Sequence, residues 1–189
     1  MTIRQRCPWC GHDPLYVAYH DTEWGRPVFE RQALFERFSL EAMQAGLSWL
    51  TVLRKRERMR ERFYGFDPDR LARAGSRQVE SWLKDAGLIR HRGKLESLIS
   101  NARCVRSLGD NFGELLWESV GGQPLINHFA RMEEVPTTTD AARALSKRLK
   151  ALGFRFVGPT MCYALMQSAG MVNDHLTSCD LHPERLNAK

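Results

Sequence analysis

One stretch sets the architecture of this chain: Leu145-Ser-Lys-Arg-Leu-Lys-Ala-Leu-Gly153-Phe-Arg-Phe-Val-Gly158-Pro159-Thr160. Its leucines recur at i, i+4 and i+7, which is the apolar stripe of an amphipathic helix. Gly153 can close that helix in the left-handed conformation, and Gly158 is expected to form a tight turn. Pro159 suits the first position of a second helix, which we expect to run to about residue 170. The stretch therefore predicts a helix-hairpin-helix over about residues 140–170.

The loop of this hairpin is a candidate anion site. Backbone N–H groups at the start of a helix lack intrahelical acceptors, and the helix dipole favours negative charge there. Lysines and arginines flank the loop, which makes a phosphate a suitable ligand. An αα-hairpin packed for stability alone fits the same pattern, because Gly-x-x-x-x-Gly loops are common.

The rest of the chain also reads as short helices. Apolar residues recur at helical spacing, strand signals are nearly absent, and residues 1–28 show no sustained periodicity. The arginine-rich run 54–62 is interpreted as a solvated helix face with internal Glu–Arg pairs, and residues 123–136 are interpreted as a loop. One expected helix runs from Glu30 to Gly46, and others begin at Ser48 and at Asp67-Pro68. A further helix runs from Ser76 to Gly87, and two more end at Gly109 and at Gly121. We predict an all-α bundle.

Composition limits the function classes. The chain has 189 residues, 43% of them hydrophobic and 26% charged, which fits a single globular domain over residues 1–189. No apolar run approaches the roughly 20 residues of a membrane span, and the N-terminal residues lack the apolar core of a signal peptide. We expect a cytoplasmic protein that makes no membrane contact. The net charge of +6 is compatible with a polyanionic partner.

Cysteines and histidines gather near the two ends of the chain. The candidate ligands are Cys7, Cys10, His12 and His20 at one end, and His175, Cys179 and His182 at the other. Structural zinc takes four thiolate or imidazole ligands, so a Cys and a His from each end would suffice. Such a site would join residues 1–28 to residues 171–189 in one lobe. The alternatives are unliganded surface residues, or a catalytic zinc with one position left open to water.

Five blocks of sequence together resemble one family. They are His20-Asp-x-Glu-Trp-Gly25, Gln44-Ala-Gly-Leu-Ser-Trp49, Ile89-Arg-His-Arg-Gly-Lys94, Gly153-Phe-x-Phe-Val-Gly158 and Val172-Asn-Asp-His175. In this order they resemble the 3-methyladenine DNA glycosylase I (Tag) family of the helix-hairpin-helix superfamily. The resemblance covers nearly the whole chain, from Cys7 to Cys179. It implies a monofunctional glycosylase that hydrolyses the N-glycosidic bond of 3-methyladenine in alkylated double-stranded DNA, releasing the free base and leaving an abasic site.

The resemblance also assigns residues to a metal and to the base. Its zinc ligands fall on four positions: Cys7, His20, His175 and Cys179. Its base pocket falls on four aromatic side chains, Trp9, Tyr16, Tyr19 and Trp49, and on the carboxylate of Glu41. An N3-methylated purine in DNA is cationic, so aromatic faces and a carboxylate suit it. Aromatic side chains are more often part of a core, and most helical glutamates are solvated, which is the alternative for these residues.

Further roles follow if the family resemblance holds. Leu47, at the tip between two helices, would fill the gap that a flipped base leaves. The amides of Gly153, Gly158 and Thr160 would hold a backbone phosphate. Asp174 is a candidate for stabilising the sugar cation, and tethering the metal lobe is its alternative role. No lysine stands in the hairpin loop, so we expect no Schiff base and no strand cleavage.

Two other functions remain open from the sequence. A DNA-binding module without pocket chemistry would keep the hairpin and the zinc lobe. A zinc-dependent hydrolase of another substrate would need an open coordination position. Nothing in the sequence requires a dimer, so we expect a monomer.

Overall fold

The computed structural model describes residues 4–187, and it is mainly helical, as predicted. The helices are α1 (Pro14–Thr22), α2 (Arg31–Gln44), α3 (Trp49–Arg62), α4 (Pro68–Leu71), α5 (Ser76–Leu83), α6 (Arg92–Leu108), α7 (Asn111–Trp117), α8 (Asp140–Ala151), α9 (Pro159–Ser168) and α10 (Pro183–Asn187). Two-residue strands β1 (Leu125–Ile126) and β2 (Val172–Asn173) pair in parallel. Short 3₁₀ turns span Pro8–Cys10, Tyr64–Phe66, Glu118–Val120 and Met132–Glu134.

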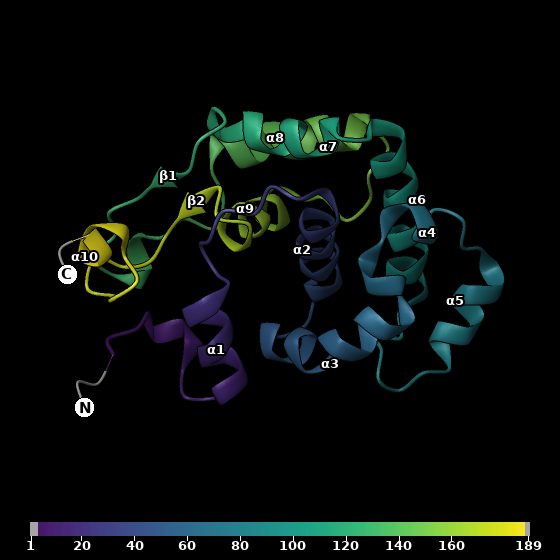
Figure 1. The fold of residues 1–189 in the computed structure, drawn as a ribbon, viewed down its shortest axis with the longest axis horizontal. Coiled ribbons are helices and arrows are strands. Elements are labelled where there is room, and N and C mark those ends of the chain that lie inside the picture. Colours follow the sequence, from purple (N-terminus) through teal and green to yellow (C-terminus); the bar gives the residue numbers. More distant parts are fainter. Residues whose placement is uncertain (1–3, 188–189) are drawn as a thin grey trace.

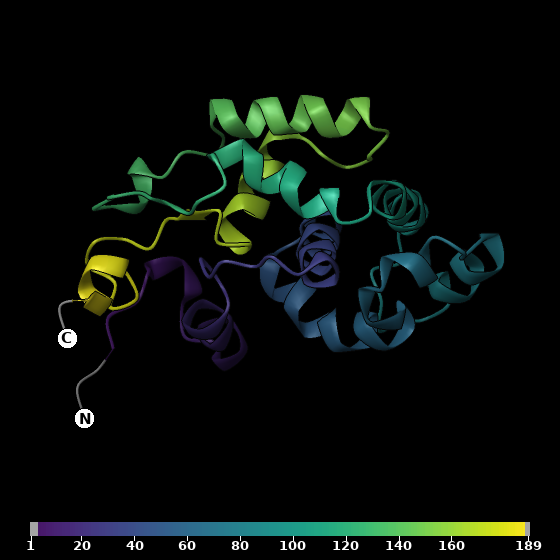
Figure 2. The same cartoon turned by 45° about the horizontal axis from the view of Figure 1, so that its top comes forward.

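Helix α2 lies at the centre of the fold and packs against α3, α6, α7 and α9 (Figure 1). Helices α4, α5 and α6 lie at one end of the molecule, and the strand pair with α10 lies at the other (Figure 2). Phe38 on α2 meets Phe112 and Phe154 in the core, where the last two rings stack at 6.0 Å. The core therefore joins α2 directly to the hairpin loop after α8.

Side-chain caps fix the helix starts that the sequence indicates. Ser48 accepts a hydrogen bond from the Thr51 amide at the start of α3, and Thr139 caps α8. Asp67 caps α4, with Pro68 in the first helical position. These caps confirm the predicted starts of α3, α4 and α8.

The hairpin forms as predicted, but its turn differs in one detail. Gly153 has φ +87° and closes α8, as expected. Gly158 is extended (φ −65°, ψ 160°) and serves as the N-cap of α9, so the prediction of a tight turn there is wrong. The left-handed residue is Phe156, at φ +58°. A phenylalanine tolerates this conformation because Asn101 holds the backbone of Arg155 on one side, and Ser146 holds the Val157 carbonyl on the other.

The arginine-rich face of α3 is not wholly solvated. Arg58 and Arg60 do pair with Glu61 and Glu57 at i, i+3 spacing. The side chain of Arg56, in contrast, is 9% exposed and lies inside the molecule, where it pairs with two carboxylates. The inward position of Arg56 follows the 3.6-residue period, which places it one turn after Val52 on the buried face.

Two segments of low periodicity are more ordered than their sequences indicate. The first 28 residues contain helix α1, and residues 123–136 contain β1 and a 3₁₀ turn. β1 and the residue after it donate hydrogen bonds to the segment after α9, from Leu125 N to Met171 O and from Asn127 N to Asn173 O. Among the described residues, no helix has the length and apolar character needed to cross a membrane.

Candidate functional site

A cavity of about 300 Å³ lies where α1, α2, α3 and α9 converge, and residues 132–136 form part of its wall. Its lining contains all five side chains that the resemblance assigns to the base: Trp9, Tyr16, Tyr19, Glu41 and Trp49. They come from a 3₁₀ turn and three different helices, so only the tertiary fold brings them together. Pockets for small ligands have this character, with apolar walls and few polar groups.

The aromatic side chains form a continuous wall. The Trp9 ring lies 5.2 Å from Tyr16 and 6.5 Å from Tyr19, and Tyr19 lies 5.3 Å from Trp49. Trp24, which the sequence reasoning did not single out, packs edge-on to Trp9 at 4.8 Å. Such a wall offers π-faces to a flat cationic ring.

Glu41 supplies the carboxylate of this cavity. It is 6% exposed, and burial raises its pKa from 4.5 to about 7, while Ser168 and Arg37 act in the opposite direction. A carboxylate kept out of water without a salt-bridge partner attracts a cation or an N–H donor strongly. The cavity can therefore select a ligand that carries positive charge or an exocyclic amine.

A buried ion-pair network holds the helices that carry these residues. Glu23, at the end of α1, pairs with Arg37 on α2 at 2.8 Å and with Arg56 on α3 at 2.7 Å. Arg56 also reaches Glu36 on α2 at 2.7 Å. The Arg37 guanidinium lies 5.8 Å from the centre of the Tyr19 ring. The network thus fixes α1 against α2 and α3 and with it the aromatic wall.

Asp174 lines the cavity, but its carboxylate already accepts three hydrogen bonds within the protein. It accepts hydrogen bonds from Asn127 (2.7 Å), Tyr163 (2.6 Å) and Gln167 (2.7 Å), and it is 2% exposed. This geometry favours the tethering role over a direct catalytic one. It ties α9 to the segment that follows β1.

Several lining residues escaped the sequence reasoning. They are Trp24, Gln44, Met132, Val135, Pro136, Ala164 and Gln167. Trp24 and Gln44 lie within two of the sequence blocks that resemble the family, and those blocks are the signal that could have identified both as cavity residues. The residues from 132 to 136 follow β1, whose pairing with β2 no local pattern indicates.

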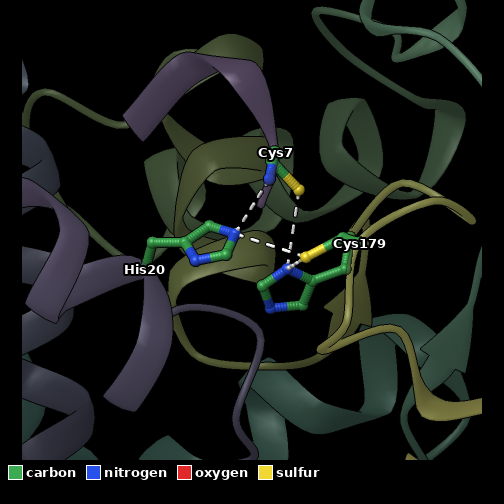
Figure 3. A group of neighbouring side chains, drawn as sticks. Cys7, His20 and Cys179 are labelled. Atoms are coloured by element: carbon green, nitrogen blue, oxygen red, sulfur yellow. Dashed lines mark hydrogen bonds between the residues drawn. The ribbon is translucent and has the colours of Figure 1, made fainter. Parts of the chain in front are cut away.

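Four buried side chains form a second group beside the aromatic wall: Cys7, His20, His175 and Cys179, whose ligand atoms lie within 4.8 Å of one another. Figure 3 shows the Cys7 and Cys179 sulfurs and the His20 ring pointing toward a common centre. The sulfur of Cys179 lies 3.6 Å from Nε2 of His20 and 3.5 Å from Nδ1 of His175, and the Cys7 sulfur lies 3.6 Å from the latter. These residues could hold a metal ion.

The outer hydrogen bonds of both histidines suit metal binding. Nδ1 of His20 donates to Asp21 at 2.8 Å, because a carboxylate can only accept. Nε2 of His175 donates to the Trp24 carbonyl at 3.2 Å. Each ring thus turns the lone pair of its other nitrogen toward the sulfurs, which is the usual outer-shell arrangement of metal-bound histidine.

The two thiols share this centre unequally. The hydrogen bond from the Cys7 thiol lowers the pKa of Cys179, although burial opposes it. The contact with Cys179 and burial raise the pKa of Cys7. The group therefore favours one thiolate even by itself, and thiolate is the form that binds metals.

The other terminal candidates stand apart from this group. Cys10 turns its thiol to the Cys7 carbonyl at 3.2 Å, and His12 is exposed. His182 donates to the Asn127 carbonyl at 3.1 Å and lies near His128. The geometry thus brings together the four residues that the resemblance assigns and leaves these three outside.

The residues assigned to DNA lie at two exposed turns. Leu47 is 38% exposed at the tip between α2 and α3, next to Gly46 at φ +76°. Gly153 and Thr160 are exposed on the hairpin, and Gly158 is half-buried. The Thr160 amide belongs to the first turn of α9, where N–H groups lack intrahelical acceptors.

Comparisons with known proteins agree over nearly the whole chain. Residues 9–182 match the family model described as methyladenine glycosylase. The chain is 48% identical over 177 residues to a DNA-3-methyladenine glycosylase of Haemophilus influenzae, which covers 92% of this chain and 96% of that protein. A crystal structure of 3-methyladenine DNA glycosylase I (TAG) superposes with a TM-score of 0.93 at 50% identity, covering 95% of this chain and all of that one. A variant of such an enzyme, solved in complex with 3-methyladenine, gives a TM-score of 0.90 at 34% identity over 94% and 97% of the two chains.

Proposed function

The chain belongs to the methyladenine glycosylase family, and we propose that it excises 3-methyladenine from alkylated DNA by hydrolysing the N-glycosidic bond. One observation carries the proposal most directly. The buried Glu41 carboxylate and the rings of Trp9, Tyr16, Tyr19 and Trp49 line one cavity in a chain that is 48% identical to a DNA-3-methyladenine glycosylase. Base-excision repair by a monofunctional enzyme follows from this assignment.

Recognition of the lesion rests on charge. Methylation at N3 makes the purine in DNA cationic, whereas normal adenine is neutral. The aromatic wall attracts the cation by its π-faces, and Glu41 accepts a hydrogen bond from the exocyclic amine. Glu41 is buried and has no salt-bridge partner in the described structure, so its ionised carboxylate carries a desolvation cost. A cationic base offsets this cost better than a neutral base does.

The chemistry requires little acid catalysis. A methylated cationic base leaves as a neutral molecule, so the lesion itself supplies much of the activation. The enzyme extrudes the base, holds it, and stabilises the oxocarbenium-like sugar as the bond breaks. No lysine lines the cavity among the described residues, which supports hydrolysis without a Schiff base and an abasic site with uncut strands.

The two exposed turns would engage the duplex. The amides of Gly153, Gly158 and Thr160 hold a backbone phosphate, so they position the enzyme without reading sequence. Leu47 enters the space that the extruded base leaves, where an apolar side chain offsets lost stacking. Asp174 tethers the neighbouring segments, as its three donors support.

We infer that the four-residue group holds a structural zinc ion through Cys7, His20, His175 and Cys179. Zinc–sulfur bonds of about 2.3 Å and zinc–nitrogen bonds of about 2.0 Å at the tetrahedral angle place S and N about 3.5 Å apart. The sulfur-to-nitrogen distances of 3.5 and 3.6 Å fit this value. Four buried protein ligands leave no position open to water, so the ion would fold the termini together rather than react with substrate.

The metal group also supports the base cavity. The ring of Trp9 lies 5.2 Å from His20, and the ring of Trp24 lies 4.8 Å from His175. Both tryptophans line the cavity on their other side. A bound zinc ion would thus keep the aromatic wall in place. We further propose that residues 1–189 form one domain that acts as a cytoplasmic monomer.

Incubation of methylated duplex DNA with the metal-loaded protein tests the proposal. Chromatography of the released bases should show free 3-methyladenine, and alkaline treatment should reveal abasic sites in strands that were uncut before. A protein that binds such DNA and releases no base would instead be a binding module. Turnover that changes with the identity of the metal, while stability does not, would indicate a metal-dependent hydrolase.

A further inference from the structure

Lys94 is a buried cation that the base-excision chemistry does not use. It lies in the first turn of α6 and is 5% exposed. Its ammonium group donates to the carbonyl of Met43 at 2.8 Å and to the carbonyl of Ala45 at 2.5 Å. Both carbonyls belong to the end of α2, which closes at Gln44. The contact joins residues about fifty positions apart in the sequence.

These carbonyls are the ones that a helix leaves without partners. The last carbonyl groups of a helix have no intrahelical donors and carry the negative end of its dipole. Lys94 satisfies two such groups at once with the charge that suits them. It therefore acts as a C-terminal cap of α2, supplied by another helix.

The capped end leads directly into the Leu47 turn. Ala45 leaves the helical conformation (φ −44°, ψ 116°), Gly46 is left-handed, and the Leu47 amide donates to the Gln44 carbonyl at 2.7 Å. Ser48 then caps α3. The turn is fixed at both ends, by Lys94 before Leu47 and by the Ser48 cap after it.

The same helix also holds the hairpin loop. Asn101, two turns after Lys94 on α6, accepts from the Arg155 amide at 2.8 Å and donates to the Arg155 carbonyl at 3.0 Å. His91, the N-cap of α6, lies edge-on to Phe156 at 6.4 Å. Helix α6 thus contacts both DNA-facing turns and sets the distance between them.

Resting on the proposed function, we propose that Lys94 is a positioning residue for base extrusion, which holds the Leu47 turn at a fixed distance from the phosphate-binding hairpin. The ammonium group does more than fill a buried site, because an apolar side chain of similar length would leave both carbonyls at the end of α2 without this donor. Burial lowers the pKa of Lys94.

The test compares excision from duplex DNA and from single-stranded DNA that carries the same methylated base. A wedge matters only where a base must leave a stack and its gap must be filled. Lys94→Met keeps the aliphatic length and removes the charge and the donors. We expect excision from the duplex to fall about tenfold or more and excision from the single strand to fall less than about threefold, since small misplacements of a positioned group have effects of this size or larger.

A matched control separates the cap from the general charge of this region. Lys55 lines the same groove as Lys94 and Leu47, but its ammonium group donates to the Ala86 carbonyl instead of the end of α2. Lys55→Met removes the same charge, so it should weaken duplex and single-strand excision by similar, small factors. A selective loss on the duplex from Lys55→Met, equal to that from Lys94→Met, would overturn the proposal.

A double-mutant cycle with Leu47→Ala gives the second measurement. If Lys94 acts through Leu47, the double variant should lose little more duplex activity than Leu47→Ala alone, whereas independent roles would make the losses multiply. Should Lys94→Met fail to fold, Lys94→Gln, which removes the charge and keeps an NH2 group as donor, carries the same comparison. Equal losses on both substrates, or multiplying losses in the cycle, would refute the positioning role. Release of 3-methyladenine by the unaltered protein tests the proposed function separately.

Discussion

Replacement of Glu41 by glutamine should make the protein more stable and less active. The pKa of Glu41 rises from 4.5 to about 7 on folding because the side chain is buried. The folded state then holds the proton more tightly than the unfolded chain, so the wild-type protein loses stability as pH rises through this interval. One pKa unit corresponds to about 1.36 kcal/mol, which makes the cost of the buried charge about 3 kcal/mol at pH 8.

Glutamine carries no charge at any pH, so Glu41→Gln escapes this cost. Urea unfolding of both proteins at equal zinc concentration should show the variant more stable by about 3 kcal/mol at pH 8 and by about 1 kcal/mol or less at pH 5. The difference between the two proteins cancels the titration of the metal ligands, which they share. A stability difference that does not change with pH would refute the assignment of Glu41 as a buried, unpaired carboxylate.

Four further predictions follow from the site and the fold. Excision of 3-methyladenine by the wild-type protein should rise with pH through about 7 as Glu41 ionises, and a flat pH–rate profile would contradict this. Cys179→Ser should lose zinc and melt at a lower temperature, and stoichiometric zinc in that variant by elemental analysis would refute the ligand assignment. Arg56→Met should cost about 2 kcal/mol in denaturant unfolding because it removes charge-assisted hydrogen bonds from Glu23 and Glu36, each of which keeps one other arginine, whereas Arg54→Met, at an exposed pair, should cost less than about 1 kcal/mol. Leu47→Ala should lower excision from duplex DNA about tenfold with an unchanged melting temperature, and full activity would remove Leu47 from the interface.

Much of the architecture was predictable because local physics fixes it. The leucine spacing of α8, the left-handed Gly153 and Pro159 at the start of α9 act through neighbouring residues only. The helix-hairpin-helix was therefore predicted within a few residues. The all-α class followed from the same kind of periodicity in α2, α3 and α6.

Helix α1 could not be predicted because it buries side chains in two different directions. Tyr16 and Tyr19 face the base cavity, while the next residue, His20, turns to the metal group. A helix that buries side chains in two directions has no single apolar stripe, so its periodicity is lost. The glycine that follows, Gly25, lies with its α-carbon against the His175 ring, where a Cβ would come within 3.2 Å. Glycine suits this position because of this contact with a residue far along the chain and because its backbone is left-handed (φ +73°).

Long-range contacts account for the other differences. Phe156 adopts its left-handed conformation because Asn101, on another helix, holds the adjacent backbone. Arg56 is buried among residues that the sequence shows only as a charged run. The cavity residues were identified through the family resemblance, because no rule of sequence spacing predicts that Trp9 and Glu41 lie in one cavity. The division into a single domain and the roles of the cavity residues remain predictions.

The central claim is that the cavity around Glu41 captures a methylated purine, and titration of the folded protein with free 3-methyladenine tests it most directly. Trp9, Trp24 and Trp49 line the cavity, so their fluorescence reports its occupancy. We predict saturable quenching by 3-methyladenine and affinity about tenfold or more weaker in Glu41→Gln, the effect of losing one charge-assisted hydrogen bond of at least about 1.5 kcal/mol. Absence of quenching, or equal affinity in the two proteins, would contradict the claim.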